Sequence, residues 1–143
     1  MSSPGEERAL RASILLVDDQ PANRALMEYL LQTLGHQART VEDAPSALAA
    51  IAQEKPYLIL MDVQLPGVDG LELTRRLKGD AATEDIYIVA VTSYAMQGDR
   101  EHALAAGCDG YLAKPIDMAS FSSTVAQFYA KKQRLDATGS GHP

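Results

Sequence analysis

Short runs of apolar residues recur along the chain and are separated by longer amphipathic stretches. Four runs are continuously apolar or nearly so, at residues 14–17, 57–61, 86–91 and 111–113. Continuous rather than alternating apolar character is typical of strands covered on both faces, as in a parallel sheet. The more polar stretch at residues 36–41 predicts a strand at an exposed edge of the same sheet.

The stretches between and after these strands place apolar residues three and four positions apart, which is the spacing of one helix face. From the first stretch to the last, these positions are Leu26, Met27, Leu30, Leu31 and Leu34; Ala47, Leu48, Ile51 and Ala52; Leu73 and Leu77; 103–106; and Met118, Phe121, Val125 and Phe128. Gly35 and Gly107 follow two of these faces and predict helix ends. Pro45 suits a first helical position, and Asp117 suits the N-cap of the last helix.

Strand and helix patterns therefore alternate five times along the chain of 143 residues. This alternation predicts an α/β fold, in which a doubly wound, five-stranded parallel sheet has right-handed crossovers and helices on both faces. The length fits one domain, which we expect to include residues 13–132. The polar residues 1–12 and the Gly- and Ser-containing residues 133–143 are expected to be flexible ends.

The composition excludes several classes of partner. A net charge of -6 and a pI near 4.9 argue against direct binding of nucleic acid and against docking on an anionic membrane. No apolar run approaches the roughly 18 residues of a membrane span. Cys108 is the only cysteine, so no internal disulfide is possible, and a cytoplasmic location is expected. His36, His102 and His142 are far apart in the sequence and are expected to be solvated rather than metal ligands.

Polar residues follow four of the predicted strands at the point where each strand ends. The first strand is followed by Asp18 and Asp19, and the third strand by Asp62. Thr92 ends the fourth strand, and Lys114 follows the fifth. Ligands of open α/β sheets bind outside the carboxyl ends of the strands, so these side chains are expected to converge on one site. Any one of the aspartates alone fits an ordinary helix cap or turn residue, and only their convergence favours a site.

Three carboxylates in one pocket repel one another unless a cation is present. Mg²⁺ prefers oxygen ligands, typically one or two carboxylates together with waters and phosphate oxygens. Lys114 is able to balance further negative charge, and Thr92 is able to donate a hydrogen bond to a phosphate oxygen. The pattern therefore favours phosphoryl transfer to a carboxylate, a reaction that needs mainly positioning and neutralisation of charge.

At these residues the sequence resembles the receiver domains of two-component response regulators. The matching stretches are 14–23, 60–70, 89–93 and 111–115, within a resemblance that covers roughly residues 13–129. The resemblance implies a flavodoxin-like sheet with the strand order 2-1-3-4-5. The runs 95–99 and 106–109 are also similar to single-domain receivers of the cell-cycle regulator type.

The resemblance also implies roles for individual residues. It implies that Asp62 is phosphorylated, and that Mg²⁺ is held by Asp18, Asp19, Asp62 and the main-chain carbonyl of Gln64. The side chains of Gln64 and Tyr94, each two positions after a site residue, are expected to tune the rate of dephosphorylation.

A conformational switch is implied by the same resemblance. Thr92 and Lys114 are expected to contact the phosphoryl group, and Lys114 is expected to precede Pro115 through a cis peptide bond. Movement of Thr92 towards the phosphoryl group would make room for Tyr111 to turn inward. The altered surface would surround the fourth helix, the fifth strand and the fifth helix.

The function that these residues favour is that of a stand-alone response regulator rather than an enzyme. It would receive the phosphoryl group from a sensor histidine kinase or a histidine phosphotransfer protein, and it would signal by contact with a downstream protein. A receiver module from a hybrid histidine kinase is an alternative. A Mg²⁺-dependent phosphatase is disfavoured because Gln64 stands where such enzymes generally carry a second aspartate. A flavin-binding protein is disfavoured because Asp18 and Asp19 would repel the phosphate of the cofactor.

Overall fold

The computed structural model describes residues 14–65, 67, 69–93 and 99–140, and the expected N-terminal segment 1–12 lies outside them. Five parallel strands form one sheet in the order β2-β1-β3-β4-β5, which confirms the predicted fold class. The strands are β1 (Ile14–Val17), β2 (Ala38–Val41), β3 (Leu58–Asp62), β4 (Tyr87–Thr92) and β5 (Gly110–Ala113). The helices are α2 (Pro21–Thr33), α3 (Ala44–Gln53), α4 (Gly70–Lys78), α5 (Asp99–Ala105) and α6 (Met118–Ser140).

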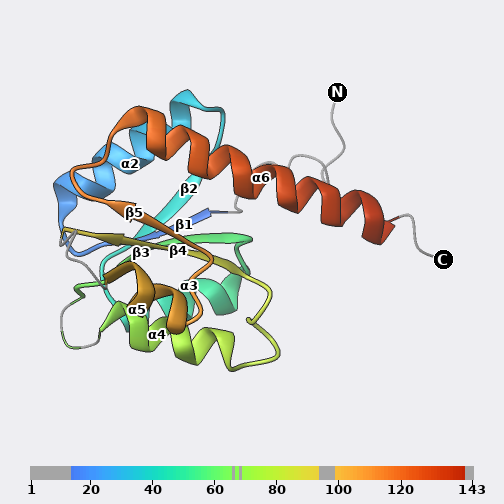
Figure 1. The fold of residues 1–143 in the computed structure, drawn as a ribbon, viewed down its shortest axis with the longest axis horizontal. Coiled ribbons are helices and arrows are strands. Elements are labelled where there is room, and N and C mark those ends of the chain that lie inside the picture. Colours follow the sequence, from blue (N-terminus) through green and yellow to red (C-terminus); the bar gives the residue numbers. More distant parts are fainter. Residues whose placement is uncertain (1–13, 66, 68, 94–98, 141–143) are drawn as a thin grey trace.

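The helices cover both faces of the sheet, with α2 and α6 on one side and α3, α4 and α5 on the other (Figure 1). Each face has its own hydrophobic cluster. In β1, for example, Leu15 packs in the cluster beneath α3 and α4, whereas Leu16 packs in the cluster beneath α2 and α6. Successive side chains of a strand point to opposite faces, so a strand buried on both faces must be apolar at every position. This explains the continuous apolar runs of the sequence.

The ends of the helices follow the local signals in the sequence. Gly35 and Gly107 have positive φ angles of 87° and 107°, which glycine adopts without steric penalty. The Asp117 carboxylate accepts a hydrogen bond from the Ser120 N–H at 2.8 Å, which confirms the predicted cap of α6. In α3 the cap is Asp43, which accepts from the Ser46 N–H, and Pro45 is therefore the second helical residue rather than the first.

Helix α6 differs from its prediction at its first residue. Met118 was expected to be buried, but it is 55% exposed. It is the first residue of the helix, and helical side chains lean towards the N-terminus, which directs Met118 away from the core beneath the later turns. At the other end, the backbone remains helical to Ser140, into the segment from residue 133 that was expected to be flexible. Gln133, Arg134, Leu135 and Ala137 are good helix formers, which favours continuation of the helix past residue 132. The domain boundary at residue 132 stays a prediction.

None of the helices within residues 14–140 that the structure describes combines the length and the apolar character needed to cross a membrane.

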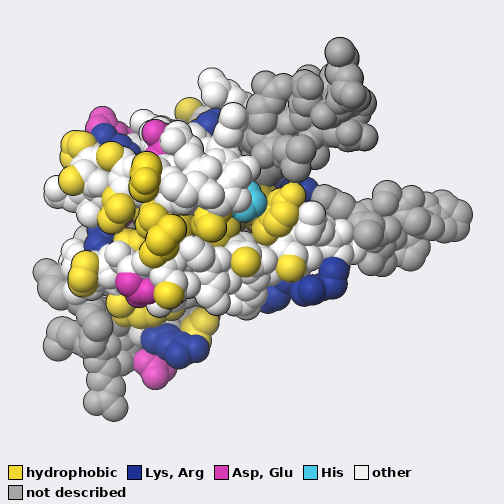
Figure 2. Space-filling model, turned by 90° about the horizontal axis from the view of Figure 1, so that it is seen from above, with side chains coloured by type: hydrophobic (Ala, Val, Ile, Leu, Met, Phe, Trp, Pro, Cys, Tyr) yellow, Lys and Arg dark blue, Asp and Glu magenta, His cyan; other side chains and the backbone are white. Residues whose placement is uncertain are grey.

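A hollow of about 360 Å³ lies between the end of α2 and the middle of α6, where His36 and Tyr129 form part of its lining. Figure 2 shows apolar side chains gathered along the line where these two helices meet. The rings of His36 and Tyr129 make an edge-to-face contact with their centroids 4.9 Å apart. Burial lowers the pKa of His36. His36 is therefore half-buried and less solvated than expected.

Replacing His36 with phenylalanine is expected to weaken the dependence of stability on acid pH. In the folded protein His36 resists protonation, whereas in the unfolded chain it takes a proton below a pH of about 6.5. Protonation therefore favours the unfolded chain, and stability is lost as the pH falls through this range. Urea unfolding at about pH 7.5 and about pH 5.5 should show a larger loss for the wild type than for His36→Phe, which keeps an aromatic ring beside Tyr129. Equal losses would contradict the prediction.

Candidate functional site

Three carboxylates meet at the carboxyl ends of the two central strands. Asp18 and Asp19 follow β1, and Asp62 ends β3, the strand paired with β1. One carboxylate oxygen from each residue can be chosen so that all three lie within 4.8 Å of one another. Asp18 and Asp62 are only 0% and 4% exposed. Strand pairing therefore brings together the acidic residues that the sequence had placed at separate strand ends.

Asp62 has two carboxylate oxygens in different surroundings. Its Oδ1 accepts a hydrogen bond from the Gln64 N–H at 2.9 Å, and its Oδ2 lies 3.4 Å from Lys114 Nζ. Burial raises the pKa of Asp62, and the neighbouring Asp18 acts in the same direction. The Gln64 N–H and Lys114 lower the pKa of Asp62 but do not reverse the effect of burial. A cation near this carboxyl group would favour its ionised form.

The carboxylate of Asp18 is held on one side and poorly satisfied on the other. Its Oδ1 accepts a hydrogen bond from the Gln20 N–H at 2.8 Å. Its buried Oδ2 lies 3.1 Å from Lys114 Nζ, but the geometry of this ion pair is not that of a hydrogen bond, and no other described residue supplies a donor. The Asp19 carboxylate makes no hydrogen bond or ion pair within the described part of the chain.

These residues fit a hard divalent cation. Three carboxylates share the site with the single ammonium group of Lys114, so negative charge is in excess. The unsatisfied Asp18 Oδ2 and the carboxylate of Asp19 are available as oxygen ligands. Mg²⁺ binds preferentially to such oxygens and keeps several waters. The donor set therefore suits Mg²⁺ better than a soft metal, which would need Cys or His ligands.

The remaining predicted site residues lie on β4, which pairs with β3, and on or just after the edge strand β5, which pairs with β4. Thr92 is buried at the end of β4, and its carbonyl accepts a hydrogen bond from the Lys114 N–H at 2.7 Å. The peptide bond between Lys114 and Pro115 is cis, the conformation that the resemblance implies. Tyr111 is half-buried on β5 and packs against the cluster that includes α4 and α5 residues. Tyr94 lies outside the described residues.

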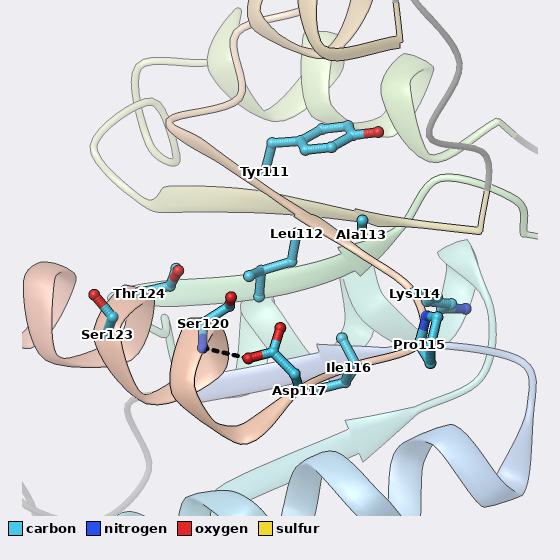
Figure 3. A pocket seen from close by; sticks show the side chains of 10 residues that line it. All are labelled: Tyr111, Leu112, Ala113, Lys114, Pro115, Ile116, Asp117, Ser120, Ser123 and Thr124. Carbon is cyan, nitrogen blue, oxygen red and sulfur yellow. Dashed lines mark hydrogen bonds between the residues drawn. The ribbon is translucent and has the colours of Figure 1, made fainter.

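A cavity of about 530 Å³ lies between β5 and the first turns of α6, and Figure 3 shows the side chains around it. Its lining runs from Tyr111 to Asp117 along the chain and includes Ser120, Ser123 and Thr124 of α6. The Tyr111 ring points away from the α6 side of this cavity in Figure 3. The cavity is part of the surface formed by α5, β5 and α6, which are the fourth helix, fifth strand and fifth helix of the sequence prediction.

Sequence reasoning missed two residues that shape the site. A methyl group on Gly70 would overlap the carbonyl oxygen of Asp62 and lie 2.9 Å from Cα of Val63, so α4 begins in close contact with the end of β3. Arg24 Nη1 donates a hydrogen bond to the carbonyl oxygen of Asp18 at 2.7 Å. The only sequence signal for Arg24 is a positive charge in the first turn of a predicted helix, where the helix dipole disfavours it.

Comparison with known proteins decides the family. Residues 14–126 match the family model of the response regulator receiver domain. The chain belongs to this family. This receiver domain is 37% identical over 116 residues to the polar-differentiation response regulator DivK of Brucella anthropi, covering 81% of this chain and 94% of that protein. DivK of Brucella ovis matches with the same identity and coverage.

Solved receiver structures share the fold. One is the receiver domain of the sensor histidine kinase PA1611 from Pseudomonas aeruginosa PAO1, which has a magnesium ion coordinated in its active site cleft. It is 36% identical with a TM-score of 0.74, and the match covers 82% of this receiver domain and 96% of that chain. A response regulator from Chloroflexus aurantiacus J-10-fl is 28% identical with a TM-score of 0.79, covering 84% and 98% of the two chains. The receiver family is not a family of classical enzymes. This match therefore disfavours both the Mg²⁺-dependent phosphatase and the flavin-binding protein considered from the sequence.

Proposed function

We propose that this receiver domain accepts a phosphoryl group on Asp62 from a histidine kinase or a histidine phosphotransfer protein. The observation that carries the proposal is the convergence of three carboxylates, from Asp18, Asp19 and Asp62, beside the Lys114 ammonium group. Asp18, Asp19, Asp62 and the main-chain carbonyl of Gln64 would hold Mg²⁺. The bound ion would neutralise charge on the phosphoryl oxygens and on the attacking carboxylate.

In the proposed reaction, Asp62 Oδ2 is the nucleophile. The Gln64 N–H holds Oδ1, whereas Oδ2 lies beside Lys114. Oδ2 forms a bond to phosphorus as the bond between phosphorus and the donor imidazole nitrogen breaks, and the electron pair of the broken bond stays on that nitrogen. Lys114 Nζ and the Thr92 hydroxyl would each bind a phosphoryl oxygen. Burial excludes much of the water that competes with the nucleophile, which suits a group-transfer site.

The proposed output is a phosphorylation-dependent contact with another protein. The phosphoryl group adds charge and hydrogen-bond acceptors at the end of β3. Thr92 would move towards it and Tyr111 would turn inward, which would alter the surface of α5, β5 and α6. Support comes from the position of both residues, Thr92 at the end of β4 and Tyr111 on the adjacent edge strand. The side chain of Gln64, exposed beside Asp62, would tune hydrolysis, together with Tyr94.

The setting of this function is also proposed. The receiver would promote its own phosphorylation and dephosphorylation, in the cytoplasm and without direct contact with nucleic acid or membrane, since the chain is acidic. The similarity to DivK over most of its length supports a stand-alone regulator. The similarity to the receiver domain of a sensor histidine kinase keeps a module of a hybrid kinase as the alternative.

Intact-mass measurement after incubation with acetyl phosphate tests the proposal. We expect one phosphoryl adduct on the wild type in Mg²⁺ buffer and none in EDTA. Asp62→Asn should form none, because an amide oxygen is a far weaker nucleophile than a carboxylate. Asp69→Asn is the matched control: Asp69 is exposed, caps α4 by accepting from the Leu71 N–H at 2.9 Å, and should still allow the adduct. A folded wild type that forms no adduct in Mg²⁺ would contradict the proposed function.

A further inference from the structure

We propose that Arg24 is a positioning residue for the acidic pair Asp18 and Asp19, and that it increases the affinity of the site for Mg²⁺. This inference rests on the proposed function, because it concerns how that site holds its cation. The contact behind it is the hydrogen bond from Arg24 Nη1 to the main-chain carbonyl oxygen of Asp18, at 2.7 Å. Arg24 therefore acts through the backbone and not as a ligand.

The backbone around Asp18 is fixed at two points. The Asp18 N–H donates to the Val41 carbonyl at 3.1 Å, and the Asp18 carbonyl accepts from Arg24. That carbonyl belongs to the peptide unit that joins Asp18 to Asp19. Because peptide units are planar, a donor that holds the carbonyl also sets the direction in which the chain enters Asp19.

Asp19 depends on this support more than Asp18 does. The side chain of Asp18 has its own contacts, through the Gln20 N–H and Lys114. The half-buried carboxylate of Asp19 has neither a hydrogen bond nor an ion pair within residues 14–65, 67, 69–93 and 99–140. Its position near Asp18 and Asp62 is therefore determined by its backbone. Without Arg24, the peptide unit before Asp19 loses the hydrogen bond to its carbonyl, and the Asp19 carboxylate is held less firmly near the other two.

The start of α2 indicates that Arg24 does not serve the helix itself. Arg24 lies in the first turn, where the positive end of the helix dipole repels a cation. This turn has no acidic residue, and its N-cap, Gln20, makes no side-chain capping hydrogen bond. Other helices start with a capping aspartate, namely Asp43, Asp69 and Asp117. A cation in the first turn of a helix goes against the helix dipole. Such an exception beside the acidic residues Asp18 and Asp19 is expected at a functional site.

The expected effect is a change in metal affinity. Loss of a group that orients metal ligands from outside the coordination shell typically lowers affinity by 10- to 100-fold. Arg24 orients one ligand through the backbone, so we expect the Mg²⁺ dissociation constant of Arg24→Ala to rise about tenfold. Arg24→Lys should recover part of the affinity, because an ammonium group is able to donate to the same carbonyl but lacks the planar fork of arginine.

Isothermal titration calorimetry with Mg²⁺ on the full chain measures this effect without any phosphodonor. The matched control is Arg39→Ala. Arg39 also donates to main-chain carbonyls, those of Ala50 and Glu54 at the end of α3. Its removal should lower the urea midpoint in EDTA and leave the dissociation constant unchanged. Arg24→Met keeps an aliphatic stem but no donor, and it should weaken Mg²⁺ binding as much as Arg24→Ala does. If Arg24→Ala does not fold, Arg24→Met takes its place in the test.

An unchanged dissociation constant in Arg24→Ala or Arg24→Met would overturn the inference, and so would an equal rise in Arg39→Ala, which would indicate a general loss of stability. These results leave the proposed function intact, since the wild type would still bind Mg²⁺. A wild type that takes up no Mg²⁺ at all would overturn the proposed function and this inference together.

Discussion

Gly70→Ala is expected to destabilise the receiver domain by about 3 kcal/mol, near the upper end of the usual cost of overpacking. The added methyl group would overlap the carbonyl oxygen of Asp62 and crowd Cα of Val63. Both neighbours belong to the backbone, which cannot rotate away as a flexible side chain does. Either the start of α4 or the end of β3 must move, and the Gly70 N–H would then lose its 2.9 Å hydrogen bond to the Val63 carbonyl.

Urea unfolding in EDTA measures this loss, with Gly79→Ala as the matched control. Gly79 ends the same helix with a φ of -87°, which alanine adopts easily. A methyl group there would lie 3.2 Å from the Arg75 carbonyl oxygen, a tight but tolerable contact. The control should change the free energy of unfolding by less than about 1 kcal/mol. Similar stability for Gly70→Ala and Gly79→Ala would refute the role assigned to Gly70.

Lys114→Met is expected to destabilise the Mg²⁺-free protein by about 3 kcal/mol at neutral pH, as removal of one partner from a buried ion pair usually does. The Lys114 side chain is only 12% exposed and lies 3.1 Å from Asp18 Oδ2 and 3.4 Å from Asp62 Oδ2. Its loss leaves buried carboxylates without a compensating cation. The destabilisation should shrink as the pH falls, because protonated carboxyl groups no longer need the ammonium group.

The control for this prediction is Lys55→Met. Lys55 also pairs with an aspartate, Asp85, at 2.9 Å, but their side chains are 47% and 68% exposed. Exposed ion pairs contribute little, so this variant should lose less than about 1 kcal/mol. Urea unfolding in EDTA at neutral and acid pH compares the two variants. Equal effects of the two substitutions, or a Lys114→Met effect independent of pH, would refute the argument from burial.

The fold and the acidic site were predictable because both depend on regular patterns. Runs such as residues 57–61 are apolar at every position since both faces of the sheet are covered. Parallel strands bring their carboxyl ends to one edge, so the residues that follow them, including Asp18, Asp62 and Lys114, were expected to meet there. The distances among their side chains agree with that expectation.

The contacts that refine the site were not predictable, because they depend on approach in three dimensions. The contact of Gly70 with the carbonyl of Asp62 arises from the turn between β3 and α4, which no periodic pattern encodes. The Arg24 side chain extends from α2 to the carbonyl oxygen of Asp18, six positions earlier. A long side chain has several rotamers, and the sequence does not determine which one it adopts. Met118 has the apolar character of a core residue, but its position at the first turn of α6 keeps it exposed.

The length of α6 has a practical consequence for measurements on this protein. A helix of 23 residues is about 34 Å long, and in Figure 1 its last turns project well beyond the sheet. Successive residues of a helix point in directions about 100° apart, so the residue chosen for a label sets the direction in which the label points. A fluorophore or spin label near Gln133 would therefore report rotation of α6 as a lever, and small changes beneath Phe128 would be magnified at the label.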